Sequence, residues 1–209
     1  MKTKITKIEA DWTDVKNKCR TTVNKDATDV PATKEFIKKV LISEHSPIRL
    51  IRVHFSWTGI KSWISVHFAR HWLGWDKWIS TQRTDRTGND RNKSPQDTAV
   101  NMDVCSTSQA LINVARWRLC RQASEETREY AEDLKVSIYK EGQTELSDVM
   151  VPNCIYRGGC PEFQACQYNI WARFLAYCKD NNLQINTIQR RYDAYHKFFY
   201  DYEEHNKQI

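Results

Sequence analysis

The chain has 209 residues, 40% of them hydrophobic and 28% charged, a composition typical of one globular domain with or without a short appendage. This balance excludes wholesale disorder, and no apolar run approaches the roughly 18 residues that a membrane span requires. Lysine and arginine exceed aspartate and glutamate by 32 − 26 = 6, a mild bias toward anionic partners that is too small to indicate a nucleic-acid binder.

The first residues, MKTKITKIEADW, are charged and contain no secretory apolar stretch. The chain has seven cysteines, an odd number without a secretory context. We therefore expect reduced thiols and a cytoplasmic protein, located in the host cytoplasm if a phage encodes it.

The hydrophobic pattern of the first half predicts two helices around one strand. Residues 34–43 have apolar side chains at helical spacing, and residues 59–72 show the same period with many aromatic and imidazole groups. Residues 48–56 alternate apolar and polar side chains, which predicts a strand with one solvated face. Residues 82–101 are polar and rich in Arg, Asp and Asn, so we expect a loop.

Further helices are predicted in the second half. Residues 106–121 have a helical apolar face, and Ser124 followed by two glutamates resembles an N-cap, so a second helix is expected to continue through Ile138. After residue 150 the sequence VPNCIYRGGCPEFQAC is rich in Pro, Gly and Cys, a composition typical of a short irregular segment or knuckle. Two helices rich in aromatic residues are predicted to follow, around 168–179 and 184–204. We therefore divide the chain into a main domain, 1–149, and a helical extension, 150–209.

Two segments carry the residues best suited to chemistry. Residues 68–95 combine the hydroxyls of Ser80 and Thr81 with several cations, and guanidinium forks beside hydroxyls suit a phosphate monoester. The alternative is a solvated basic loop. In residues 108–131, Arg118 falls near a helix end, where the alternative is an exposed cation stabilised by the helix dipole.

Together these segments resemble the flavin-dependent thymidylate synthases. That family's signature opens with Arg-His-Arg and closes with Ser-x-Arg; here Arg70-His71 opens it and Ser80-Thr81-Gln82-Arg83 closes it. Upstream, SEHSPIRLIRVHFS (43–56) is similar to the family's His-x-Ser/Thr-Pro stretch entering a strand. Downstream, residues 90–95 resemble its Ala-Arg-x-x-Leu-Pro segment, and residues 110–131 follow its last conserved block.

The sequence also departs from this pattern. Trp72 stands at the third signature position, part of 76–79 replaces the Asn-Glu pair, and one extra residue precedes Arg83. Arg49 replaces a glutamate that is usual in the family, and residues 150–209 have no counterpart. These departures indicate a divergent, phage-type member.

The resemblance implies an α+β fold, with helices packed around a small twisted antiparallel sheet, and a homotetramer whose active sites lie where subunits meet. It also implies a set of site residues. FAD would be bound by Ser46, Arg70, His71, Trp72, Thr107, Gln109 and Asn113, with Trp72 stacking on a ring. The nucleotide would be bound by His67, Arg70, Ser80 or Thr81, Arg83, Arg91 and Arg118.

The implied reaction is methylation of dUMP at C5 to give dTMP, with methylenetetrahydrofolate as one-carbon donor and NADPH-reduced FAD as hydride source. Arg118 would stabilise the negative charge that develops on the N3–O4 edge of the base, as an oxyanion donor does. A related modification, methylation or hydroxymethylation of dCMP or dUMP for modified phage DNA, is the alternative. Arg118 favours uracil, because cytosine presents an N4 amine to this donor. Neither a membrane nor a nucleic acid is expected as a partner.

The cysteines leave three interpretations open. Cys154, Cys160 and Cys166 are spaced C-x5-C-x5-C and could bind zinc, with Cys178 or His196 as fourth ligand. They could equally be packed thiols or form a disulfide. Cys19, Cys105 and Cys120 are expected to be small buried apolar residues. A function of another class, a non-catalytic nucleotide or nucleic-acid binding module with a zinc knuckle, also stays open.

Overall fold

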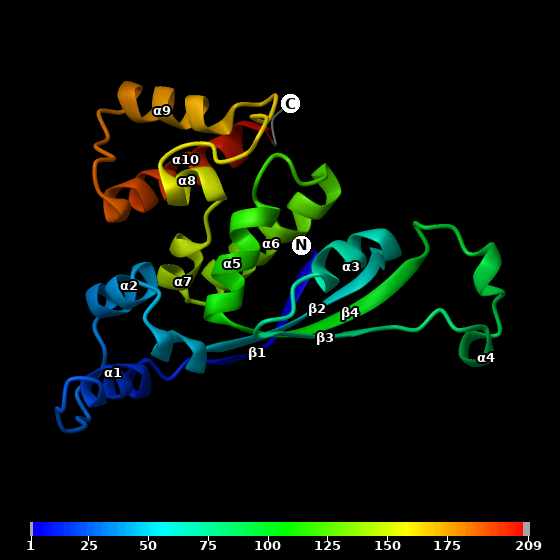
Figure 1. Ribbon diagram of the computed structural model, residues 1–209, viewed down its shortest axis with the longest axis horizontal. Coiled ribbons are helices and arrows are strands. Elements are labelled where there is room, and N and C mark those ends of the chain that lie inside the picture. Colours follow the sequence, from blue (N-terminus) through cyan, green and yellow to red (C-terminus); the bar gives the residue numbers. More distant parts are fainter. Residues whose placement is uncertain (1, 207–209) are drawn as a thin grey trace.

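The protein is an α+β structure in which helices cover one small sheet (Figure 1). The computed structural model describes residues 2–206, the last five by their backbone alone. The sheet has the order β1-β2-β4-β3, and every neighbouring pair is antiparallel. Its strands are β1 (Thr3–Glu9), β2 (Arg52–Lys61), β3 (Trp75–Ile79) and β4 (Ala99–Thr107). The predicted fold class is confirmed.

The helices fall into three groups. The sequence between β1 and β4 contains α1 (Trp12–Thr21), α2 (Lys34–Ile42), α3 (Ser62–Ala69) and α4 (Thr84–Thr87), with the 3-10 helices η1 (Ser46–Leu50) and η2 (Arg91–Lys93). Against the sheet lie α5 (Ser108–Arg118) and α6 (Glu125–Lys140), and α7 (Thr144–Val149) packs against α6 and α2. The layer beyond them contains α8 (Asn153–Arg157), α9 (Ile170–Asp180) and α10 (Ile188–Asn206). None of the described helices is both long and apolar enough to cross a membrane.

The alternation of side chains on β2 places the core. Val53, Phe55 and Trp57 are buried on one face of the strand, and each such fully buried apolar side chain contributes roughly 1.5–3 kcal/mol. The Trp57 ring packs against Phe68, with 4.5 Å between ring centroids, and its Nε1 donates to Thr3 Oγ1 at 2.8 Å. The central strand is therefore anchored to both α3 and the edge strand β1.

The structure confirms most predicted helices and corrects the strands. The helices expected at 34–43, 106–121, 168–179 and 184–204, and after Ser124, are α2, α5, α9, α10 and α6. The strand predicted at 48–56 begins only at Arg52, because Pro47 starts a short 3-10 helix.

The helix predicted over 59–72 is shorter. Strand β2 continues across a bulge at Gly59, where φ is +70°, so α3 begins at Ser62 and ends at Ala69. Strands β1, β3 and β4 were not predicted. In β4 a signal was available, since Val100, Met102 and Val104 alternate with polar residues.

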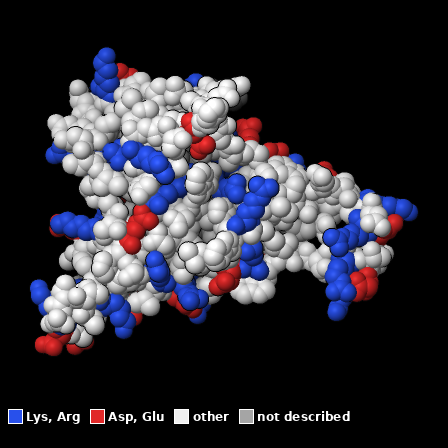
Figure 2. Space-filling view, in the orientation of Figure 1, with Lys and Arg blue, Asp and Glu red and all other residues white. Residues whose placement is uncertain are grey.

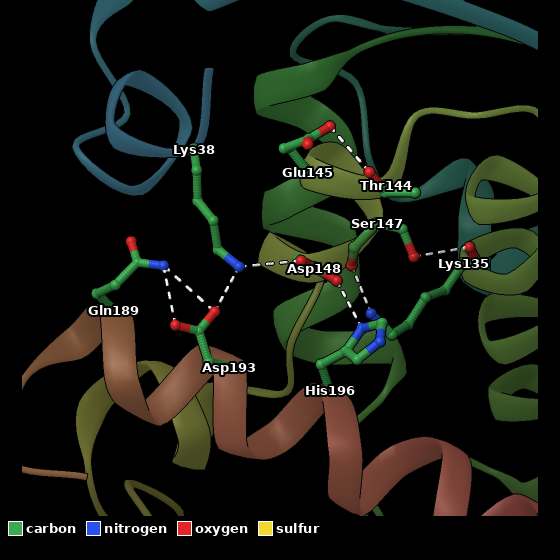
Figure 3. Close-up of polar contacts among 9 residues, drawn as sticks. All are labelled: Lys38, Lys135, Thr144, Glu145, Ser147, Asp148, Gln189, Asp193 and His196. Carbon is green, nitrogen blue, oxygen red and sulfur yellow. Dashed lines mark hydrogen bonds and ion pairs between the residues drawn. The ribbon is translucent and has the colours of Figure 1, made fainter. Parts of the chain in front are cut away.

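A partly buried charged cluster connects α10 to the main domain (Figure 3). Lys38 of α2 pairs with Asp148 of α7 at 3.0 Å and with Asp193 of α10. His196 Nδ1 lies 2.6 Å from Asp148 Oδ1, and the Lys135 ammonium, fully buried, donates to the Ser147 carbonyl. Burial raises the pKa of Asp148, but the bonds from His196 and Lys38 outweigh it and leave this pKa below its ordinary value.

We predict that Asp148→Asn destabilises the protein by about 3 kcal/mol, because it leaves the Lys38 ammonium partly buried with one counter-ion fewer. Urea denaturation followed by circular dichroism measures the change. The control is Glu35→Gln, which removes an ion pair to Lys39 whose side chains are 77% and 72% exposed, and it should cost less than about 1 kcal/mol. Equal effects of the two substitutions would show that the cluster does not hold the extension in place.

Candidate functional site

The loop between α3 and β3 is held against the start of α5. Gly74 has φ +70°, and a Cβ at this position would lie 2.5 Å from Thr107 Oγ1, so only glycine permits the approach. The Thr107 N–H donates to the Gly74 carbonyl at 2.8 Å, and the Thr107 hydroxyl caps α5 by accepting from the Ala110 N–H at 3.3 Å. The residues that precede Gly74 are thereby placed alongside α5.

Arg118, at the end of α5, reaches the beginning of this loop. Its Nε donates to His71 Nε2 at 3.0 Å, and its Nη2 donates to the His67 carbonyl at 2.6 Å. His67 is oriented in turn, because its Nδ1 lies 2.9 Å from the hydroxyl of the buried Thr127. The structure therefore brings together three of the predicted site residues, Arg118, His71 and His67.

The charges in this group keep the imidazoles neutral. Burial, followed by the charges of Arg118 and Lys77, lowers the pKa of His71 from 6.5 to about 4. Burial and the neighbouring guanidinium groups of Arg118 and Arg70 also lower the pKa of His67. At neutral pH His71 Nε2 is therefore a lone-pair acceptor for Arg118, and the ring proton is on Nδ1.

Beside this group lies a cavity of about 370 Å³, called here the open pocket. It is lined by His71, Trp117, Arg118, Cys120, Gln122, Ala123 and Glu162. The Trp117 side chain is 52% exposed, so the pocket combines a flat apolar ring with a guanidinium and a neutral imidazole. Such a lining suits a planar ligand ring on which negative charge develops.

Of the seven residues that line the open pocket, the sequence identified only His71 and Arg118 as site residues. Glu162 belongs to the extension, and no periodicity or motif signals that this segment folds back beside α5. Trp117, Cys120, Gln122 and Ala123 lie at or just beyond the end of α5, where no motif of the sequence marks them as ligand-binding residues. Arg70 and Trp72 follow α3 with exposed side chains, and Trp72 is 76% exposed.

The remaining predicted nucleotide residues lie on a projecting arm, residues 80–98, which carries α4 and η2 (Figure 1). Ser80 accepts from the Asn101 N–H at 2.9 Å where the arm begins, and Thr81 is exposed next to it. Arg83 forms two hydrogen bonds to Asp85, of 2.7 and 3.0 Å, and Arg91 is exposed in η2. Figure 2 shows basic and acidic side chains mixed at the far end of this arm. Within one chain these residues do not line the open pocket.

The predicted FAD residues are also divided. Gln109 Nε2 donates to Glu44 at 2.6 Å, and Asn113 Oδ1 lies 3.4 Å from Arg116 Nη1. Arg116 also pairs with Glu44 and lies over the Tyr156 ring, 3.6 Å from its centroid. This network is separate from the open pocket. Ser46 is exposed at the start of η1.

The structure places a fourth cysteine beside the three that the sequence groups together. Cys154, Cys160 and Cys166 do line one cavity, but Cys120 lines it with them, whereas Cys178 is absent from the lining and His196 pairs with Asp148. Within residues 2–206, no three His, Cys, Asp or Glu side chains form a ready-made metal-binding group. Cys105 and Cys120 are buried as expected, whereas Cys19 is only half-buried.

Comparisons with known proteins identify the fold. No family model and no curated protein matches the sequence. The structure, however, is similar to the flavin-dependent thymidylate synthase ThyX of Helicobacter pylori solved with FAD and dUMP: the TM-score is 0.57, the identity 12%, and the match covers 71% of this chain and 99% of that one. The protein has the ThyX fold.

A second structure with the ThyX fold is similar to the same degree. The UMP/dUMP methylase PolB of Streptomyces cacaoi, solved with 5-Br dUMP, matches with a TM-score of 0.57 and 15% identity over 72% of this chain and 95% of that one. At these identities the likeness concerns the fold alone. The roles of the site residues are therefore argued from their own geometry.

We predict that the His71 ring titrates with a midpoint near pH 4, measured by NMR of the ring protons. Arg118→Met should raise this midpoint by removing a nearby positive charge, although burial keeps it below 6.5. Because His71 takes up its proton at lower pH when folded than when unfolded, stability should fall as the pH decreases from 6.5 toward 4. Arg190→Met, on α10, should leave the midpoint unchanged. A wild-type midpoint near 6.5 would show that burial and Arg118 do not lower this pKa, and a midpoint well above 7 would exclude the neutral acceptor.

Proposed function

We propose that the protein is a flavin-dependent enzyme that modifies the base of dUMP at C5, and specifically that it methylates dUMP to dTMP. The observation that carries this proposal is the Arg118 guanidinium, held by a neutral His71 and the His67 carbonyl at the wall of the open pocket. The ThyX fold supports it, because the similar structures were solved with FAD and dUMP or with a brominated dUMP.

Part of this chain fits FAD and part does not. Trp117 and His71 present flat surfaces to the open pocket, while Arg70, Trp72 and Ser46 are exposed and would contact the cofactor. Gln109 and Asn113 are instead engaged with Glu44 and Arg116, and Thr107 caps α5. When bound, NADPH-reduced FAD supplies the hydride and methylenetetrahydrofolate the one-carbon unit, so that a methyl group replaces the C5 hydrogen, which leaves as a proton.

Arg118 has the clearest chemical role. As a bond forms at C5, negative charge accumulates on the N3–O4 edge of uracil, and a guanidinium already in place stabilises it without reorganisation. The two acceptors of Arg118 are neutral, so its positive charge is not cancelled by a carboxylate in these contacts. The same donor favours uracil over cytosine, because the N4 amine of cytosine offers no acceptor. The less favoured alternative substrate is dCMP.

The phosphate would be bound by the arm residues Ser80 or Thr81, Arg83 and Arg91. Since these residues do not line the open pocket of their own chain, we propose that the site is completed by a second copy in a homotetramer. This arrangement would also explain why so much of the arm is exposed: every residue from Arg83 to Lys93 is exposed to solvent. Size-exclusion chromatography with light scattering measures the assembly.

We predict that the purified protein binds FAD and releases tritium from C5-labelled dUMP when NADPH and methylenetetrahydrofolate are present. Labelled dCMP should react much more slowly, because of the donor at position 118. A colourless protein that does not bind added FAD would overturn the flavoenzyme and favour a non-catalytic nucleotide-binding module. Faster tritium release from dCMP than from dUMP would show that the substrate base is cytosine.

Arg118→Ala should retain FAD and lower turnover by at least ~100-fold, the usual scale for losing one oxyanion donor. Flavin absorbance and the tritium assay measure the two effects separately. Arg190→Ala, an exposed arginine on α10, is the matched control and should leave turnover unchanged. Near-normal turnover in Arg118→Ala would refute the role of this side chain.

A further inference from the structure

Four of the seven cysteines surround one small cavity, called here the thiol cavity. Cys120 comes from just beyond the end of α5, Cys154 from α8, and Cys160 and Cys166 from the irregular segment between α8 and α9. The other three cysteines, Cys19, Cys105 and Cys178, are not part of this lining. Three separate stretches of chain therefore direct thiols to one point.

Ordinary core packing does not account for this gathering. A free cysteine that serves as a small apolar residue is normally buried, as Cys120 and Cys154 are. Cys160, by contrast, is exposed and Cys166 only half-buried. Their position at the thiol cavity thus requires a reason other than removal of apolar surface from water.

The segment that carries these two thiols, residues 158–169, has no fully buried residue. Phe163 is fully exposed, and the Tyr168 ring, 44% exposed, contacts the guanidinium groups of Arg121 and Arg173. Its polar contacts include the Gly159 N–H to the Cys154 carbonyl at 2.9 Å and Gln122 Nε2 to the Gln164 carbonyl at 2.7 Å. All seven cysteines are free thiols, so no disulfide bond constrains the segment. Short segments without a core of their own are commonly held by a metal ion.

The size of the thiol cavity favours a single ion. Its volume is about 10 Å³, which is room for about one water-sized sphere and too little for a multi-iron cluster. Besides the four cysteines, its lining residues are Pro161, Glu162, Ala165, Asn169, Ile170 and Trp171. Tetrahedral coordination by four sulfurs is the preferred arrangement of structural zinc.

We propose that Cys120, Cys154, Cys160 and Cys166 bind one Zn²⁺ as four thiolates. Binding releases the four thiol protons to solvent and forms four Zn–S bonds of about 2.3 Å. Since no ready-made metal-binding group exists among the described residues, the segment with Cys160 and Cys166 must close onto the ion.

The zinc site would fix one wall of the open pocket. Cys120 follows Arg118 by two residues, and Glu162 lies between two ligands while lining the open pocket with His71 and Arg118. The ion would thus hold the extension against the end of α5. The site does not depend on the proposed reaction, because its ligands make no use of flavin or nucleotide.

The test is metal content and spectroscopy of the full-length protein. Elemental analysis should find about one zinc per chain. After exchange, Co²⁺ should give the intense sulfur-to-metal charge-transfer absorption and the visible bands of a tetrahedral thiolate site. Cys120→Ser and Cys160→Ser should lose the zinc and this spectrum, whereas Cys178→Ser, a buried thiol outside the thiol cavity, should keep both.

Several outcomes would overturn the proposal. These are no metal in the wild-type protein, bound iron in place of zinc, a disulfide between two of the four cysteines, and full zinc retention in both ligand variants. Because Cys160 is exposed, Cys160→Ser should fold even if the buried Cys120→Ser does not. Circular dichroism checks this, and Cys160→Ser then decides alone. If zinc is bound but no tritium is released, only the proposed enzymatic function fails.

Discussion

The arrangement of the candidate site depends on how one guanidinium is held at the end of α5. Arg118 is half-buried, yet its hydrogen bonds go to an imidazole and a carbonyl, both of them neutral. Arg116, one helical half-turn earlier, is held differently, by the Glu44 carboxylate and the face of Tyr156. Two arginines on one helix are therefore held differently: Arg116 pairs with a carboxylate within the fold, whereas the hydrogen bonds of Arg118 go to neutral acceptors.

The neutrality of His71 follows from the same arrangement. A partly buried imidazole next to a guanidinium loses affinity for its proton, because burial and the like charge both disfavour the imidazolium. His71 therefore stays an acceptor across the physiological pH range, and the orientation of Arg118 is maintained there. The glycine at position 74 is a further requirement, because it lets the loop with His71 lie against α5.

The extension is joined to the main domain by two different kinds of interaction. Outside the open pocket, the partly buried side chains of Lys38, Asp148 and His196 form polar contacts between α2, α7 and α10. Beside the open pocket, the segment before α9 lies next to the end of α5, with two of its cysteines lining the thiol cavity and Glu162 lining the open pocket. Through the second connection the extension becomes part of the pocket wall, which gives residues 150–209 a direct connection to the proposed function.

The sequence by itself determined the helices with a clear apolar face, the family resemblance, and the residue types around Arg70, His71 and Arg118. These features depend on local spacing, which hydrophobic periodicity and short motifs record. The order of the strands, the pairing of Arg118 with His71 across 47 residues, and the entry of Cys120 into the thiol group were decided only by the tertiary structure. The physical reason is that such contacts depend on how separate elements pack against each other, and no local pattern within one element specifies its distant partner.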